Sequence, residues 1–319
     1  MTSIITGVGA ALPKTRVTND DFPEMGVDSD WIVSRTGVRQ RFHLQNNERL
    51  VDLTVRAAKM AIADADSQAD CIDKVIVATS TPDRISPGLA AELASLIGAN
   101  RAGAVDINAA CTGFLYALDY AIARIEQGTS NRILVVGADA MSRLIDNTDP
   151  NMAFLFGDGA GAVIVEASEQ LACDVCEQYM SFGSDGSYAN YLSVDRDTGL
   201  LRMDGGEVYN SAVDSMASEI RNVLLDFGLE NGDIDYFVCH QANVRIVNAV
   251  ARELCLPREK AVSYVDQFGN TSAASIPIAL WKAQEDQRLT PGNRLVLAAF
   301  GAGFTWGAGL VNWKRCQHK

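Results

Sequence analysis

The chain has 319 residues, of which 48% are apolar and 21% are charged, and its formal net charge is −13 at pH 7. This composition is typical of a globular protein with a substantial core, built as one large domain or two of ordinary size. The negative charge argues against general nucleic-acid binding, which needs clustered lysine and arginine. The lack of a signal-peptide pattern and of a long apolar segment predicts a cytoplasmic protein outside the membrane.

Seven cysteines are scattered along the chain, an odd number that indicates reduced thiols rather than a disulfide scaffold. Cys173 and Cys176 form a CxxC pair, but a zinc site needs four ligands and the sequence has no second pair. We therefore expect neither a bound metal nor a resident cofactor.

The sequence repeats itself at an offset of about 162 residues. Residues 72–77 align with residues 234–239, and residues 131–136 align with residues 293–298. Each of these runs is short, apolar and rich in β-branched residues, which predicts a buried strand.

Amphipathic patterns predict a helix before each of these strands. The expected helices cover residues 55–64, 114–127, 215–227 and 275–286. Both halves therefore read strand, helix, strand, helix, strand, which predicts an α/β protein whose sheets are covered by helices on both faces.

The boundary between the halves is expected near residues 166–175, after an apolar strand at residues 162–165. This divides the chain into an N-terminal half, residues 1–168, and a C-terminal half, residues 169–319. No Pro/Ser-rich linker separates them, so we expect them to pack as one rigid unit.

Cys111 lies in Ala109-Ala110-Cys111-Thr112-Gly113, where an extended apolar run gives way to a helical pattern. A cysteine in the first turn of a helix lies at the positive end of the helix dipole, which lowers the thiol pKa and favours a nucleophile near neutral pH. The alternative is a structural role, because cysteine is also a common small core residue.

His240 emerges from a predicted buried strand, whereas His43 and His318 lie in a polar stretch and in the C-terminal tail. A histidine beside apolar residues is often structural, but imidazole chemistry at Cys111 would have to use His240. Asn270 lies in a glycine turn, where asparagine often caps a helix. The repeat places it opposite Cys111, so we expect these three side chains to converge at strand ends as the parts of covalent acyl transfer.

Glycines mark three further segments. Residues 157–161 and 7–9 are expected to be close-packing or tight-turn positions rather than phosphate loops, because no helix follows either segment. Residues 301–303 follow the last strand of the second repeat, where a turn could direct a backbone N–H at a reacting carbonyl.

At these residues the chain resembles the β-ketoacyl-acyl-carrier-protein synthase III family of thiolase-fold condensing enzymes. The matching motifs appear in family order across essentially the whole chain, at residues 30–37, 109–114, 156–162, 240–243, 269–274 and 303–307. The resemblance implies a thiolase-like fold, in which two duplicated βαβαβ-type halves pack as a five-layered αβαβα unit, and a homodimer.

The resemblance also implies a decarboxylative Claisen condensation. Cys111 would take an acyl group from a coenzyme A thioester, and malonyl-acyl carrier protein would then lose carbon dioxide and attack the acyl-cysteine. His240 and Asn270 would hydrogen-bond the malonyl thioester oxygen, while the backbone N–H groups of Cys111 and Ala302 would form the oxyanion hole. Coenzyme A and the carrier's phosphopantetheine arm would be parts of substrates, not cofactors.

The resemblance assigns coenzyme A or pantetheine binding to four residues, Trp31, Arg35, Asn243 and Gly205. Pro150 stands where the family usually carries an arginine that helps to hold the nucleotide. Both coenzyme A and a carrier protein therefore remain open as the donor of the first acyl group.

Ser86 and Phe300 would line the acyl pocket, and a small residue at position 86 would admit longer or branched primers. Arg84 and Arg143 could meet a carboxylate-ended primer, although solvated surface arginines are the commoner explanation.

Arg245 and Arg252 lie seven residues apart on the predicted helix after His240 and so share a face. With Arg258 and Lys260 nearby, they could form the basic surface that an acidic carrier protein needs. A solvated helix face is the alternative.

Three functions fit these residues. A decarboxylating condensing enzyme fits best, and an acyltransferase that passes the acyl group from Cys111 to an alcohol or amine is the second. A non-catalytic partner subunit is the third, but it would normally have lost one of the three side chains. A papain-like protease shares cysteine, histidine and asparagine, yet the duplicated α/β pattern argues against it.

Overall fold

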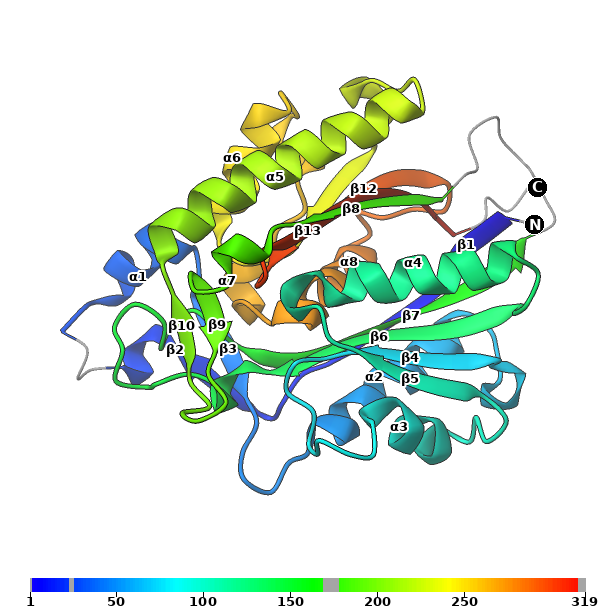
Figure 1. The fold of residues 1–319 in the computed structure, drawn as a ribbon, viewed down its shortest axis with the longest axis horizontal. Coiled ribbons are helices and arrows are strands. Elements are labelled where there is room, and N and C mark those ends of the chain that lie inside the picture. Colours follow the sequence, from blue (N-terminus) through cyan, green and yellow to red (C-terminus); the bar gives the residue numbers. More distant parts are fainter. Residues whose placement is uncertain (1, 23–25, 169–177, 315–319) are drawn as a thin grey trace.

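The computed structural model describes residues 2–22, 26–168 and 178–314, which form alternating layers of helix and sheet (Figure 1). One sheet belongs to the N-terminal half and has the strand order β1 (Thr2–Ala11), β7 (Asp158–Ser168), β6 (Arg132–Ala140), β4 (Lys74–Ala78), β5 (Gly103–Ile107). The other has the order β11 (Tyr236–Cys239), β12 (Asn293–Gly301), β13 (Thr305–Trp313), β8 (Tyr179–Ser184). A parallel pair between Ile5 of β1 and Trp313 of β13 joins the two sheets.

Helices cover both faces of each sheet, in an αβαβα order (Figure 1). The central layer holds α4 (Gly113–Glu126) and α8 (Ser275–Glu285). The outer layers hold α2 (Leu50–Asp64) and α3 (Leu89–Ile97) on one side, and α5 (Gly205–Asp226) and α6 (Val244–Glu253) on the other. The five-layered arrangement is therefore as expected. No helix in the described ranges is long and apolar enough to cross a membrane.

Shorter elements lie around one end of the layers (Figure 1). They are α1 (Ser29–Thr36), α7 (Val265–Phe268) and two small antiparallel sheets, β2 (Thr15–Thr18) with β3 (Gln40–His43) and β9 (Leu192–Val194) with β10 (Leu201–Met203).

Residues separated by 162 positions share unusual backbone conformations, which confirms the repeat. Ala110 and Ser272 have left-handed φ values of 47° and 50°, and Asp66 and Gly228 have φ values of 48° and 62°. The repeat is less regular in one place: the strand that would match β5 is reduced to an isolated bridge at Ala261.

The glycines at residues 7–9 and 157–161 allow helices to pack closely on strands, as expected. A Cβ at Gly7 would lie 2.2 Å from the carbonyl oxygen of Ala61 in α2, and one at Gly161 would lie 2.7 Å from the backbone nitrogen of Ile278 in α8. Neither segment precedes a helix that could hold a phosphate.

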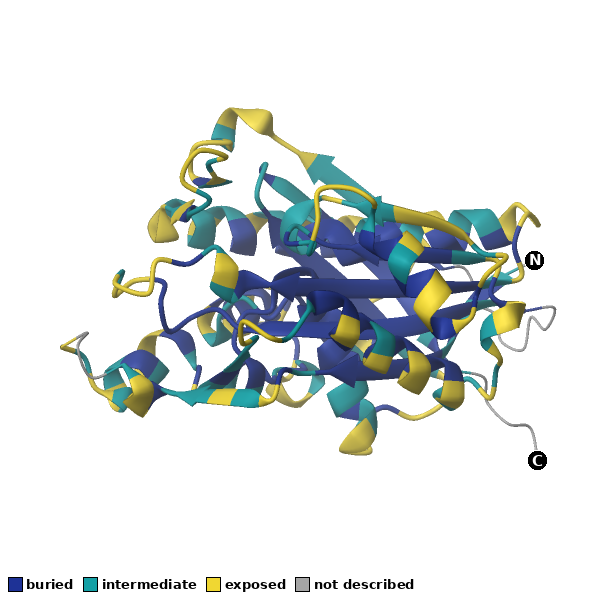
Figure 2. Ribbon diagram, turned by 90° about the horizontal axis from the view of Figure 1, so that it is seen from below, coloured by how far each residue is buried: buried dark blue, intermediate teal, exposed yellow. Residues whose placement is uncertain are grey.

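The buried residues concentrate in the two sheets and the helices between them (Figure 2). α4 and α8 are apolar on several sides because they contact sheets above and below. The predicted boundary between the halves follows the end of β7 at Ser168, and residues 169–177, which include Cys173 and Cys176, lie outside the described residues.

Candidate active site

A cavity of about 590 Å³ lies where the two halves meet, and Cys111, His240 and Asn270 all line it. Cys111 follows β5, and His240 follows β11. Asn270 comes after the isolated bridge at Ala261, which stands in the second half where β5 stands in the first. The structure thus brings together, at strand ends, three side chains that are far apart in the sequence. The described residues contain no group of three or more His, Cys, Asp or Glu placed to hold a metal.

Cys111 lies in a short 3-10 helix, Ala110–Thr112, directly before α4. Its Sγ is 3.4 Å from the Ser272 hydroxyl of the matching 3-10 helix, Ser272–Ala274, before α8. The pKa of the Cys111 thiol is raised to about 12, mainly by burial; the hydrogen bond from Ser272 opposes this rise and the negative charge of Asp139 contributes to it. The expected lowering of this pKa is therefore wrong, because desolvation of the thiolate outweighs the helix dipole.

His240 comes directly after β11 and is 3% exposed. Its backbone N–H donates to the carbonyl oxygen of Ala298 at 2.8 Å, and its Nδ1 is 2.7 Å from the hydroxyl of Ser275. Burial lowers the pKa of His240 to about 4, so the imidazole is neutral at neutral pH.

Asn270 is fixed on both sides by the N-terminal half. Its backbone N–H donates to Leu155, and its carbonyl accepts from Gly157 at 3.0 Å. The side-chain Oδ1 accepts from the backbone N–H of Ser272 at 2.9 Å, so Nδ2 is the group left to donate to a ligand.

The end of β12 packs against the nucleophile segment. A Cβ added to Gly301 would lie 2.9 Å from the amide nitrogen of Cys111. Ala302 follows and lines the cavity, and Thr305, whose hydroxyl donates to the Ala302 carbonyl at 3.1 Å, also contacts the Thr112 hydroxyl at 2.8 Å. The two segments expected to form an oxyanion hole are therefore adjacent.

All four residues assigned to coenzyme A or pantetheine binding line the cavity: Trp31, Arg35, Asn243 and Gly205. The Arg35 guanidinium lies 4.4 Å from the Trp31 ring centroid, a cation–π contact. Asn243 caps α6 and donates to the carbonyl oxygen of Arg35 at 3.2 Å, which ties α6 to α1. Pro150 lies in an exposed turn beside the cavity residue Asp149.

The four basic residues proposed for carrier docking divide into two kinds. Arg245 and Arg252 are exposed on α6, and Arg258 is exposed in the short 3-10 helix after it. Arg245 also lines the cavity and lies over the Tyr209 ring. Lys260, by contrast, donates to backbone carbonyls including that of Ile234 at 2.5 Å, so its charge is engaged in the fold.

Of the two residues expected in the acyl pocket, one lines the cavity of this chain and the other does not. Phe300 is buried at the end of β12 and lines the cavity. Ser86 lies in an exposed loop and does not line the cavity of its own chain. The loop projects outward, and the neighbouring Ile85 is 93% exposed, so a single chain does not test the expectation for Ser86, which stays a prediction.

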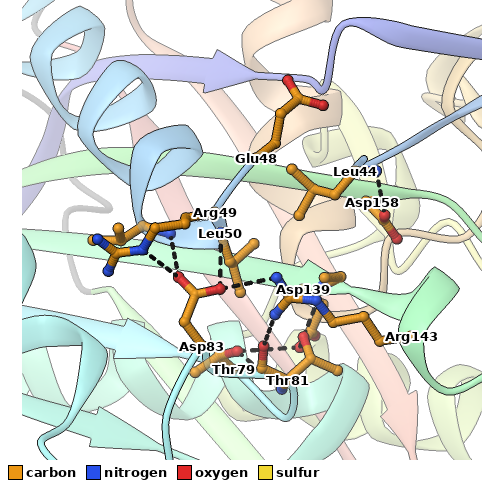
Figure 3. A network of polar contacts seen from close by, with 12 residues as sticks. Leu44, Glu48, Arg49, Leu50, Thr79, Thr81, Asp83, Asp139, Arg143 and Asp158 are labelled. Carbon is orange, nitrogen blue, oxygen red and sulfur yellow. Dashed lines mark hydrogen bonds and ion pairs between the residues drawn. The ribbon is translucent and has the colours of Figure 1, made fainter. Parts of the chain in front are cut away.

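Arg84 and Arg143 do not line the cavity either, and each is paired with an acid. Arg143 contacts Asp83 at 2.9 Å, and Arg84 contacts Glu92 at 2.9 Å. Figure 3 shows Arg143 in this network, directed toward the Asp83 carboxylate. The possibility that either arginine meets a carboxylate-ended primer is therefore not supported.

Three polar residues at the site received no role from the sequence: Asp139, Ser272 and Ser275. Asp139 ends an apolar strand, and Ser272 occupies the repeat position of Ala110, so the alignment of the halves could have singled them out. Ser275 carries no comparable signal, because serine is common at a helix start.

Models of known families match both halves of the chain. The model described as 3-Oxoacyl-[acyl-carrier-protein (ACP)] synthase III matches residues 105–186, and its C-terminal companion matches residues 224–313. A β-ketoacyl-[acyl-carrier-protein] synthase III from Bartonella tribocorum is 42% identical over 322 residues, covering 98% of this chain and 99% of that protein.

Solved structures that carry the same description are similar to this chain in fold. A 3-oxoacyl-[acyl-carrier-protein] synthase III from Aquifex aeolicus has a TM-score of 0.93 and 38% identity, covering 98% of this chain and 100% of its own. The corresponding protein from Pseudomonas aeruginosa has a TM-score of 0.92 and 38% identity, with both chains fully covered.

Proposed function

The chain belongs to the 3-oxoacyl-[acyl-carrier-protein] synthase III family, and we propose that Cys111, His240 and Asn270 carry out its reaction. Its thiolase-like fold and its activity are those of the family, an acyltransferase that initiates fatty acid biosynthesis. The family implies acyl-coenzyme A and malonyl-acyl carrier protein as substrates. The observation that supports the assignment of residues is their convergence on one cavity.

In the first step, the Cys111 sulfur attacks the carbonyl of the primer thioester, and coenzyme A leaves. The backbone N–H groups of Cys111 and Ala302 stabilise the negative oxygen of the tetrahedral intermediate. Close packing of Gly301 on the Cys111 amide supports this role, because it fixes the two segments relative to each other.

In the second step, the malonyl thioester loses carbon dioxide, and the resulting carbanion attacks the acyl-cysteine. The enolate oxygen that forms transiently is stabilised by Asn270 Nδ2 and the His240 imidazole. The low pKa of His240 supports this role, because the neutral imidazole carries one N–H that can donate a hydrogen bond to the enolate oxygen.

The mouth of the cavity would bind the long arm of both substrates. Trp31 and Arg35 form a platform for an adenine or a phosphate, and Asn243 and Gly205 lie along the path to Cys111. The carrier protein, which is acidic, would dock on Arg245 beside this mouth, with Arg252 on the same exposed helix face.

A homodimer is supported by the free edge of the N-terminal sheet. The first three residues of β5, Gly103, Ala104 and Val105, are exposed, and β5 ends the strand order. An unprotected edge strand normally pairs with another strand, so we propose that a second copy covers it. Light scattering during gel filtration tests this: native protein should elute as a dimer, and Ala104→Pro as a smaller species.

The reaction is tested by incubating the protein with acyl-coenzyme A thioesters of increasing length and then with malonyl-acyl carrier protein. The expected result is release of carbon dioxide and a β-ketoacyl product, both detected by mass spectrometry. An acyl-Cys111 that forms but never causes release of carbon dioxide would favour the alternative, an acyltransferase that forms no carbon–carbon bond.

A further inference from the structure

His240 is held in one tautomer by Ser275. The Ser275 oxygen accepts the backbone N–H of Gln241 at 3.2 Å and lies 2.7 Å from His240 Nδ1. Among the described residues, no other acceptor for the Ser275 hydroxyl hydrogen is found, so this hydroxyl donates to Nδ1. The proton of the neutral imidazole is then on Nε2, which makes this nitrogen a donor and leaves it unable to take the proton of Cys111.

The thiol has another hydrogen-bonding partner, the Ser272 hydroxyl at 3.4 Å. The Ser272 side chain also interacts with the carboxylate of Asp139, which is fully buried at the end of β6, and this contact opposes the rise in the pKa of Asp139. The backbone N–H of Ala273 donates to the same carboxylate at 3.1 Å and fixes the 3-10 helix that carries Ser272. Cys111, Ser272 and Asp139 are therefore joined in one series of polar contacts.

The other partners of Asp139 are all donors. The backbone N–H of Ser80 donates at 2.8 Å, and the hydroxyls of Thr79 and Thr81 donate at 3.3 and 2.9 Å (Figure 3). Each threonine oxygen accepts a backbone N–H in turn, from Thr81 and Ala140 respectively, so neither hydroxyl is free to reverse.

These contacts keep Asp139 as an unprotonated acceptor while the site is at rest. No salt bridge in the described part of the chain reaches this carboxylate. Ser272 is therefore the one partner that could accept a hydrogen bond from a protonated Asp139. Burial raises the pKa of Asp139, which makes it a better proton acceptor than an ordinary carboxylate.

We propose that Asp139 receives the thiol proton of Cys111 through the hydroxyl of Ser272, while His240 serves only as a hydrogen-bond donor. This inference rests on the proposed role of Cys111 as the nucleophile. Asp139 touches no substrate, so it is a positioning residue that acts through Ser272.

In the loading step, one proton moves from Cys111 to Asp139 and back. The S–H bond of Cys111 breaks and its proton passes to the Ser272 oxygen, while the Ser272 proton passes to Asp139. The thiolate forms a C–S bond with the primer carbonyl as the C–S bond to coenzyme A breaks. The departing thiolate takes the proton back from Asp139 through Ser272, so coenzyme A leaves as a thiol and the carboxylate is restored.

The test compares Asp139→Asn with the native enzyme in three rates: alkylation of Cys111 by iodoacetamide, loading of Cys111 from acyl-coenzyme A, and decarboxylation of malonyl-acyl carrier protein. Asparagine cannot accept the proton, so alkylation and loading should fall by about 10²-fold or more. Decarboxylation, which needs no thiolate, should stay unchanged.

Asp158→Asn is the matched control. Asp158 is also a fully buried carboxylate with only donor partners, the N–H of Leu44 at 2.8 Å and the N–H and hydroxyl of Ser142, but it has no hydrogen bond to Ser272 or Cys111. This variant should load Cys111 at the native rate.

The sign of the alkylation change decides the outcome. If the carboxylate acted on the thiol only through its charge, Asp139→Asn would lower the pKa of Cys111 and speed alkylation, and that result would overturn the proposal. Equal loss of loading and decarboxylation in Asp139→Asn would also overturn it. Failure of the native enzyme to load Cys111 would instead refute the proposed function itself.

Ser272→Ala provides an independent test if Asp139→Asn does not fold. Ala110, at the repeat-related position, already holds a left-handed φ of 47°, so alanine is tolerated in this conformation. Removing the Ser272 hydroxyl interrupts the proposed proton route, so it should slow loading as much as Asp139→Asn does, and native-rate loading would count against the route.

Discussion

Gly301→Ala should disturb the nucleophile without changing any polar side chain. A Cβ at this position would lie 2.9 Å from the amide nitrogen of Cys111, 3.2 Å from its Cβ, and 3.2 Å from the amide nitrogen of Thr112. The φ of Gly301 is not left-handed, so alanine can adopt the backbone and the effect comes from these contacts alone.

The size of the effect follows from the closest contact. Cβ contacts under 3.0 Å essentially never occur in proteins, so β12 or the 3-10 helix of Cys111 must shift. Overpacking of this kind costs about 1–3 kcal/mol of folding free energy. Displacement of an oxyanion donor should lower the rate of Cys111 loading by about 10²-fold.

The assay is a rapid-quench time course of acyl-enzyme formation by intact mass, with thermal unfolding measured in parallel. Gly186→Ala is the control, because a Cβ there meets nothing within 4 Å. Loading at the native rate by a folded Gly301→Ala enzyme would refute the claim that the Cys111 amide must be held in place.

Three further predictions concern single groups. Asn270→Ala should load Cys111 normally and decarboxylate malonyl-acyl carrier protein about 10²-fold more slowly; equal loss of both rates would overturn its role. Because burial lowers the pKa of His240 from 6.5 to about 4, the unfolded chain binds more protons between these values. The free energy of unfolding should therefore fall by about 3 kcal/mol as pH drops from 6.5 to 4, and chemical denaturation should show a smaller fall in His240→Gln. Arg245→Glu should raise KM for the carrier substrate more than Arg252→Glu does, because only Arg245 reaches the cavity; the reverse order would contradict the docking surface.

Much of the fold followed from the repeat in the sequence. The offset of 162 residues predicted paired strands and helices, and the structure repeats even the left-handed residues Ala110 and Ser272 at that spacing. Helix starts were less accurate: α2 begins at Leu50 and α5 at Gly205, ahead of the predicted residues 55 and 215. The first turns of α5 are largely polar and obscure its apolar pattern, whereas the first turn of α2 already buries Leu50, Val51 and Leu53 and could have been included.

The site was predictable in its residue types but not in its electrostatics. A helix start next to Cys111 indicated a lowered thiol pKa, but the enclosure of the sulfur by the opposite half of the molecule raises that pKa instead. Burial of this kind depends on the packing of segments far apart in the sequence, as do the contacts of Asp139 and Ser275.

The assignment of the acyl group to Cys111 is tested most directly by isolating the acylated enzyme, locating the acyl group by peptide mass, and adding malonyl-acyl carrier protein. We expect the acyl group on the peptide that contains Cys111, and its loss should be matched mole for mole by carbon dioxide and β-ketoacyl product. An acyl group on an exposed cysteine such as Cys71 or Cys255 would contradict the assignment, as would its loss without carbon dioxide.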